Sequence, residues 1–201
     1  MNGLLFIKAL LLGFSVSAPV GPIGLLCIQR TLSRGKAAGF LTGFGAVTAN
    51  LIYASIAALG LSVVSAFLVE QEIYLRIFGS LFLFYVGIKT LLKAPANHAA
   101  QIQGEALLSM YLSTFVLMIT NPATILNFVA MFSGLGINPE NGSGAETAAL
   151  ISGVFFGASL WWAILSIAVS LFRKKVTPHL AFINKMAGGI IILLGLLAII
   201  R

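Results

Sequence analysis

Residues 9–29 read ALLLGFSVSAPVGPIGLLCIQ, an uncharged apolar run that two prolines interrupt near its middle. A helix needs about 20 apolar residues to cross the hydrocarbon core of a bilayer, and this run is long enough. Pro19 and Pro22 each lack a backbone donor and clash with the preceding helical turn, and Gly21 lies between them. The stretch therefore predicts a membrane-spanning helix that is broken near its middle.

The rest of the chain has the same apolar character. Only 8% of its 201 residues are charged, compared with about 25% in a soluble domain, so most of the surface must face lipid. Backbone polar groups in lipid must be paired within their own segment, which favours helices. Further spans are expected within residues 37–69, 73–92, 106–139, 147–172 and 181–200. We predict an all-α integral membrane protein with about six transmembrane helices in a single membrane domain, residues 1–201.

An alternative interpretation of the N-terminus is a cleaved signal peptide. The tripeptide at residues 16–18, Val-Ser-Ala, follows an apolar stretch and has the small residues of a cleavage site. Lys8 interrupts that stretch, however, and the apolar sequence continues to Ile28. We therefore expect the first span to be retained.

Basic residues are predicted to gather in loops on one side of the membrane. These are Arg30, Arg34 and Lys36 after the first span, Lys89 and Lys93 around the end of the third, and Arg173, Lys174 and Lys175 after the fifth. The opposite side carries Glu70, Glu72, Glu140 and Glu146. The positive-inside rule then places both termini outside. The net charge of +7 is accounted for by these loops, and no dense basic patch predicts binding to nucleic acid.

The two halves of the chain echo each other, with a first repeat at about 1–93 and a second at about 106–201. Residues 22–28, PIGLLCI, align with residues 122–128, PATILNF. Glycines four apart follow in the second and fifth spans, and small residues eight apart follow in the third and sixth. Three spans per repeat is an odd number, so the second repeat must be inverted, with broken helices 1 and 4. The alternative is a chance recurrence of glycine and proline, which are common in membrane helices.

Polar residues near the two breaks form the candidate substrate site. A broken helix frees carbonyls and exposes a helix N-terminus, and both need partners. Thr120, Thr124 and Asn127 are spaced to share one face of the fourth span, as are Asn50 and Tyr53 in the second. The candidate substrate-binding residues are Pro19, Gly21, Pro22, Asn50, Tyr53, Thr120, Asn121, Pro122, Thr124 and Asn127. The alternatives are that the prolines only kink their helices and that Asn50 makes a hydrogen bond between helices.

The sequence gives little support for a metal site, a cofactor or a catalytic site. Cys27 is the sole cysteine, aspartate is absent, and His98 and His179 fall in predicted loops, so no metal site or cofactor is expected. No acidic residue lies deep in a span, and no nucleophile or phosphate-binding motif is present. We therefore predict no catalytic residues and no enzymatic activity. The expected partners are a small-molecule substrate and the lipid bilayer.

Two blocks of sequence resemble a known family. The run from Pro19 to Leu32, PVGPIGLLCIQRTL, with Gly35 and Gly39 after it, and residues 121–128, NPATILNF, are similar to the LysE/RhtB family of amino-acid exporters. The resemblance covers nearly the whole chain. It implies a bacterial inner-membrane exporter of amino acids or related metabolites, driven by the proton motive force. One departure is Asn50, where such proteins often carry aspartate, and an amide cannot take up and release a proton.

Two other functional classes stay open at this point. A small membrane subunit that captures substrate for an ATP-dependent uptake system would also have this size and number of spans. A membrane enzyme is disfavoured, because Asp, Glu, His and Cys residues do not cluster in the sequence. Pairs of small residues are compatible with a homodimer but do not require one.

Overall fold

The computed structural model describes residues 2–18, 21–92, 104–121, 123–134, 143–176 and 179–200, and the elements among them are all α-helices. In chain order they are α1 (Asn2–Ser17), α2 (Pro22–Arg34), α3 (Lys36–Ala58), α4 (Ser62–Glu70), α5 (Glu72–Leu91), α6 (Gly104–Ile119), α7 (Ala123–Gly134), α8 (Gly144–Val176) and α9 (Leu180–Ile200). The prediction of an all-α membrane protein is confirmed.

Both predicted breaks are present. α1 and α2 meet at an angle of 79°, and α6 and α7 meet at 68°, each across a gap of no more than four residues. Pro22 is at the start of α2, where its missing amide proton costs no hydrogen bond and its fixed φ suits the first helical turn. The first and fourth predicted spans are therefore bent pairs of helices.

The number of spans is confirmed only in part. Among the described residues, α3, α5 and residues 144–173 of α8 are each long and apolar enough to cross a membrane. Counting each bent pair as one span gives up to five. Within α9, Ala181–Leu197 is a shorter apolar helix. Six spans therefore require α9 to cross as well.

One local prediction was wrong. Arg30 and Arg34 are not in a loop but in the last turns of α2, and only Gly35, with φ of 95°, separates α2 from α3. The span predicted within residues 37–69 is α3, which ends at Ala58, and a second helix, α4, begins at Ser62. Gly60 has φ of 64° in the turn between them, a backbone conformation that glycine adopts without steric cost.

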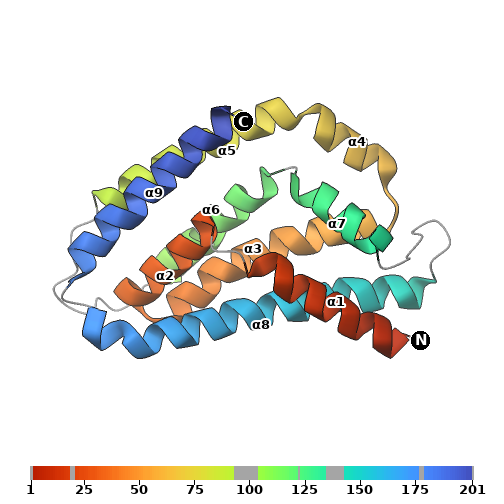
Figure 1. Cartoon of the computed structure of the whole chain (residues 1–201), viewed down its shortest axis with the longest axis horizontal. Helices are drawn as coiled ribbons and strands as arrows, with labels where there is room; N and C mark the ends of the chain where they lie inside the picture. Colours follow the sequence, from red (N-terminus) through yellow and green to blue (C-terminus); the bar gives the residue numbers. More distant parts are fainter. Residues whose placement is uncertain are drawn as a thin grey trace.

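Figure 1 shows α8 along one edge of the molecule and the pair α5 and α9 along the opposite edge, with α3 between them. α8 packs against α1, α2 and α3, whereas α3 also packs against α6 and α7. Glycines allow the closest approaches. A Cβ at Gly153 would lie 2.6 Å from the Phe6 carbonyl oxygen, and one at Gly87 would lie 2.7 Å from Ile192 Cγ1. The small-residue pairs predicted from sequence are therefore helix-packing contacts.

The outer faces carry large apolar side chains. Phe78, Leu81 and Tyr85 of α5 are more than half exposed, and so are Phe182 and Leu193 of α9. Exposed apolar surface of this extent is stable when lipid covers it. These faces fit a protein embedded in a bilayer.

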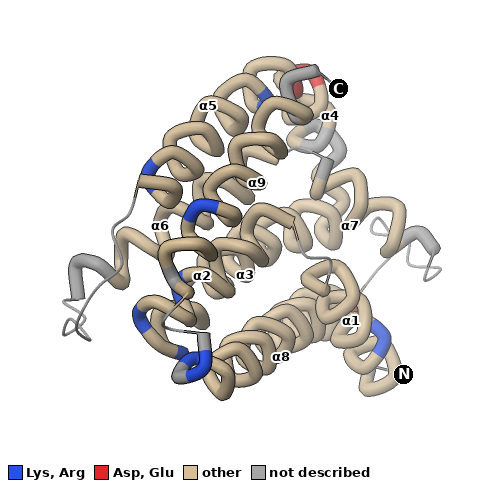
Figure 2. Tube along the Cα trace, turned by 60° about the vertical axis from the view of Figure 1, so that its left-hand side comes forward, with Lys and Arg blue, Asp and Glu red and all other residues tan. Residues whose placement is uncertain are grey.

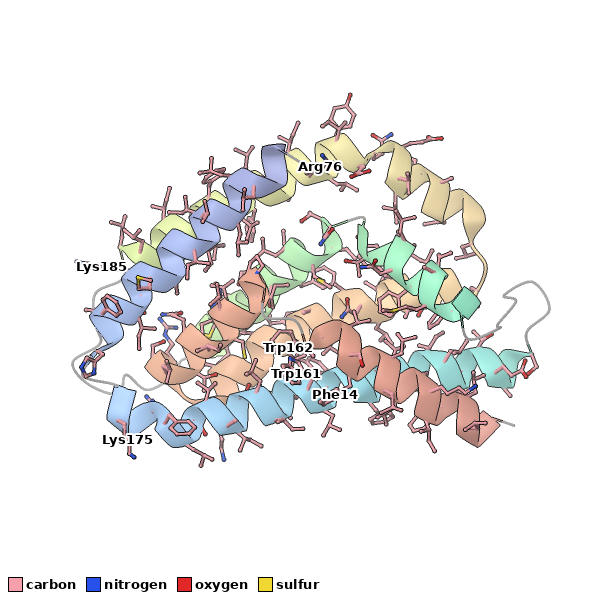
Figure 3. All side chains as sticks on the ribbon, viewed as in Figure 1. Phe14, Arg76, Trp161, Trp162, Lys175 and Lys185 are labelled. Carbon is pink, nitrogen blue, oxygen red and sulfur yellow. The ribbon has the colours of Figure 1, made fainter. Side chains whose placement is uncertain are left out.

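Most described basic residues gather at one end of the bundle, which we call the basic end (Figure 2). Arg34 ends α2, Lys36 begins α3, and Lys175 is near the end of α8, at the left of Figure 3. Arg173 of α8 donates hydrogen bonds to the Leu32 and Ser33 carbonyl oxygens of α2. The prediction that the loops after the first and fifth spans share one side is therefore confirmed. The prediction that both termini lie outside stays a prediction.

Candidate polar site at the two helix breaks

The first break exposes the N-terminal turn of α2. Gly21 is its N-cap and supplies no side-chain hydrogen bond, and the Leu25 amide donates to the Gly21 carbonyl oxygen at 3.1 Å. The amides of Ile23 and Gly24 precede that bond, so they point out of the helix end toward the break. The partial positive charge of a helix N-terminus favours an anionic group there.

The second break exposes the C-terminal turn of α6. The Tyr53 hydroxyl of α3 donates a 2.5 Å hydrogen bond to the carbonyl oxygen of Ile119, the last residue of α6. Thr120 follows, is buried, and donates to the Val116 carbonyl oxygen at 2.8 Å. A Cβ added at Gly79 of α5 would lie 3.1 Å from Thr120 Oγ1, so α5 approaches this break from the other side. The predicted residues Tyr53 and Thr120 thus lie together.

Asn50 of α3 has an unpaired carbonyl group in the interior. Its residue is 2% exposed, and its Oδ1 has no hydrogen-bond partner among the described residues. Gly43, Val47 and Tyr53 are buried with it, so the predicted shared face of this helix is confirmed. An unsatisfied buried polar group costs about 1–3 kcal/mol, and such groups in native proteins are usually paired with water or a ligand.

Other unpaired polar atoms come from the helices around Asn50. Ser17 Oγ is at the end of α1, and Ser159 Oγ and Trp162 Nε1 are one turn apart on α8. Trp161 packs edge-on against Phe14 of α1 with ring centroids 5.3 Å apart, and Figure 3 shows these rings with Trp162 at the middle of the bundle. Ser17 is one turn beyond Phe14 on α1. It therefore lies near the same level of α8.

The contacts between α3 and α8 place Asn50 at a similar level. A Cβ at Gly43 would collide with the ring of Trp162, and Val47 lies in one apolar cluster with Trp162 and Cys27. Asn50 is one turn further along α3 than Val47. The middle of the bundle thus combines unpaired donors and acceptors with two helix ends. Such an arrangement can hold a small polar molecule by hydrogen bonds, without a formal charge from the protein.

The remaining predicted site residues are placed differently from one another. Thr124 is buried, but Asn121 and Asn127 are exposed. Thr120, Thr124 and Asn127 do not share one helix face, because α6 ends at Ile119 and the chain bends before α7. Gly21 and Pro22 are half-buried at the first break. Pro19 and Pro122 lie outside the described residues.

Sequence reasoning missed three residues of this region and its surroundings. Ser17 precedes the Pro-Gly-Pro break directly, and that adjacency could have revealed it. Arg30 is eight residues after Pro22, so a helix restarting at the proline would have included it. Trp162 gives no local signal, because its burial depends on Gly43 of a helix more than a hundred residues away in sequence.

Among the residues that the structure describes, no group of three or more His, Cys, Asp or Glu side chains could hold a metal ion. The polar atoms in the middle are hydroxyl, amide and indole groups. Groups of these kinds can form hydrogen bonds with organic molecules.

Long apolar helices and two bent pairs of helices define a multi-pass membrane protein by class. The sequence model of the LysE type translocator family matches residues 14–201. The chain belongs to this family.

Two relatives share extended similarity with the chain. One is the "Putative amino acid efflux protein YcgF" of Bacillus subtilis (strain 168), 28% identical over 181 residues, which cover 88% of this chain and 85% of the relative. The other is the "Uncharacterized membrane protein YahN" of Escherichia coli (strain K12), 25% identical over 147 residues, covering 72% of this chain and 65% of the relative. No solved structure matches the chain.

Proposed function

We propose that this protein is a secondary exporter of amino acids or related small metabolites across the bacterial inner membrane, driven by the proton motive force. The observation that carries the proposal is the pair of bent spans with unpaired polar atoms between them, in a chain of the LysE type translocator family. The relative from Bacillus subtilis, named for amino acid efflux, supports the direction and the substrate class.

Alternating access between two inverted three-helix repeats is the proposed mechanism. Exchanging the repeats would map α1 and α2 onto α6 and α7, α3 onto α8, and α5 onto α9. The packing supports this exchange. In the first repeat α1 and α2 both pack on α8, and in the second repeat their counterparts α6 and α7 both pack on α3, the counterpart of α8. Inverted repeats bind substrate near the bilayer midplane at broken helices. Residues about 1–93 and 106–201 are the proposed repeats.

The proposed substrate site is formed around Asn50 and Tyr53 of α3. Gly21, Pro22, Thr120 and Thr124 border it, and Pro19, Asn121, Pro122 and Asn127 remain proposed members. In this arrangement the carbonyl of Asn50 accepts from a substrate ammonium group, and the N-terminus of α2 attracts its carboxylate. No described carboxylate lies beside Asn50, so nothing there neutralises a second positive charge. A neutral amino acid fits this site better than lysine or arginine.

Efflux from preloaded cells or vesicles tests the function directly. A mixed pool of amino acids is loaded, and the release of each is followed with and without an uncoupler. We expect selective efflux of one or a few amino acids that collapses with the uncoupler. Efflux of no amino acid would refute the proposal, and uptake together with a co-purifying ATPase would favour a substrate-capture subunit instead.

Substitutions of Asn50 test the site. Asn50→Leu removes the unpaired acceptor, and we expect efflux to fall about tenfold or more, the effect of losing one buried hydrogen bond to a charged group. Asn50→Asp adds a titratable charge, so we expect a pH-dependent rate and a shift toward cationic substrates. Asn127→Leu removes the amide of another proposed member of the site, and we expect a smaller loss of efflux because Asn127 is exposed on α7. Unchanged efflux by Asn50→Leu in normally inserted protein would remove Asn50 from the site.

A further inference from the structure

The C-terminal half of α2 is bonded to several helices through two adjacent side chains. Arg30 Nη1 donates to the Met110 carbonyl oxygen at 2.8 Å and to Thr42 Oγ1 at 3.2 Å, and Nη2 donates to Ser113 Oγ at 2.8 Å. Gln29 Nε2 donates to Asn184 Oδ1 at 2.9 Å. These bonds join α2 to α3, α6 and α9 at the basic end.

The last turn of α2 is bonded to a further helix. Arg173 of α8 donates from Nε to the Leu32 carbonyl oxygen at 3.0 Å and from Nη2 to that of Ser33 at 3.3 Å. The last carbonyls of a helix have no partner within it, so this guanidinium supplies one. α2 is thereby held on every side on which a helix packs against it.

The acceptors of Arg30 are all uncharged. Two are hydroxyl oxygens and one is a backbone carbonyl oxygen, and Arg30 forms no ion pair with a carboxylate of the described residues. A planar guanidinium forms such bonds only in a fixed geometry. They are lost together when α2 shifts, and no bound counter-charge resists the release of the guanidinium to water. Such a contact suits a reversible closure better than permanent packing.

We propose that Arg30 is the positioning residue of a gate that closes the basic end, and that α2 must leave α6 for this end to open. The inference deepens the proposed transport function and rests on it. The substrate site is on the far side of this contact, at the N-terminus of α2. Arg30 therefore acts on transport by holding α2, without touching substrate.

Cys27 provides a built-in reporter of this gate. It is the sole cysteine of the chain and is fully buried. Its Sγ donates to the Gly39 carbonyl oxygen at 3.4 Å and lies 3.6 Å from Ser166 Oγ, so it is enclosed between α2, α3 and α8. A movement of α2 away from these helices would expose the thiol to reagents from the basic end.

The test measures the rate at which a membrane-impermeant maleimide labels Cys27 in vesicles of each orientation. We expect Arg30→Gln to be labelled roughly tenfold faster than wild type from the basic side only, the effect of losing hydrogen bonds of a charged donor. Arg34→Gln is the matched control. It removes the same charge one turn along α2, and no hydrogen bond of Arg34 to a described residue is seen. Ser113→Ala removes one acceptor with little risk to folding, and we expect a smaller increase of about threefold.

Labelling of Arg30→Gln and Ser113→Ala at the wild-type rate would overturn the gate. Equal acceleration by Arg34→Gln would also overturn it, because the cause would then be net charge. Arg30→Lys keeps the positive charge but lacks the planar guanidinium with its several fixed donors. We therefore expect its labelling rate to lie between those of wild type and Arg30→Gln. Since labelling needs no substrate, absent amino-acid efflux with faster labelling would refute the proposed substrate and leave the gate standing.

Discussion

The second halves of the two bent spans, α2 and α7, are held in the bundle by different forces. α2 is bonded through Gln29 and Arg30 to α9, α3 and α6, and Arg173 reaches it from α8. α7 instead packs by Ile125, Phe128 and Phe132 into the apolar cluster that contains Tyr53. Between described residues, no side-chain hydrogen bond joins α7 to another helix.

This difference has a mechanical meaning in a membrane. Hydrogen bonds depend steeply on geometry, so α2 separates in one step when its bonds break. Apolar contacts between helices gain little over contacts with lipid tails, which are equally apolar, so α7 can shift gradually. We infer that the basic end opens in one step, when the hydrogen bonds of α2 break together. At the opposite end, α7 instead slides gradually against its apolar neighbours.

The largest expected effect concerns the prolines that separate the halves of each bent span. Pro22→Ala restores an amide proton, which allows the helical hydrogen bonds of α1 to continue into α2. We expect both Pro22→Ala and Pro122→Ala to lose transport, with efflux reduced by more than about tenfold at a normal membrane level. Efflux of the pool described above measures the loss, and membrane level is checked by immunoblot.

The two proline variants also test the equivalence of the halves. Full efflux in both would eliminate the broken-helix site. Loss in Pro22→Ala alone would show that only α2 requires a break, and the proposed repeat symmetry would then not extend to function.

The next largest effect concerns the packing of α7. Phe128 is fully buried, so Phe128→Ala should destabilise the protein by about 3–5 kcal/mol through the cavity it leaves. Phe78→Ala is the control, because Phe78 of α5 is 54% exposed, and we expect less than about 0.5 kcal/mol. Thermal unfolding in detergent measures both. Accelerated Cys27 labelling in Phe128→Ala, from a protein that is still folded, would show that α7 and α2 are coupled and not independent.

The smallest expected effect concerns a single hydrogen bond of α2. A double-mutant cycle of Gln29→Leu and Asn184→Leu isolates the pair. We expect a coupling energy of about 0.6 kcal/mol, typical of hydrogen bonds between membrane helices. A coupling energy of zero would mean that this bond does not hold α2. The hydrogen bonds of Arg30 and those of Arg173 would then be the ones that hold it.

Prediction from sequence was most successful where the cause is local. Pro22 forces a break wherever a helix reaches it, and the glycines along the spans provide close packing without regard to partner. It failed where two separate helices, α6 and α7, were predicted to share one continuous helix face. Thr120 and Thr124 have helical spacing, but Thr120 follows the end of α6 and Thr124 is in α7, beyond the bend. Arg30 was assigned to a loop because charge was taken as the end of a span.

From the sequence alone it follows that this chain is helical, embedded in lipid and broken in its first and fourth spans. Apolar length and proline act on the chain locally, so they need no knowledge of the neighbours. Which polar groups are paired depends on how the helices pack against one another. The Oδ1 of Asn50 is buried without a partner among the described residues, whereas Asn127 is exposed, although both are amides on apolar helices. The physical reason is that a hydrogen bond requires a donor and an acceptor within about 3 Å of each other. For a side chain that bonds to another helix, the partner comes from a distant part of the chain, so the local sequence does not reveal whether it is there.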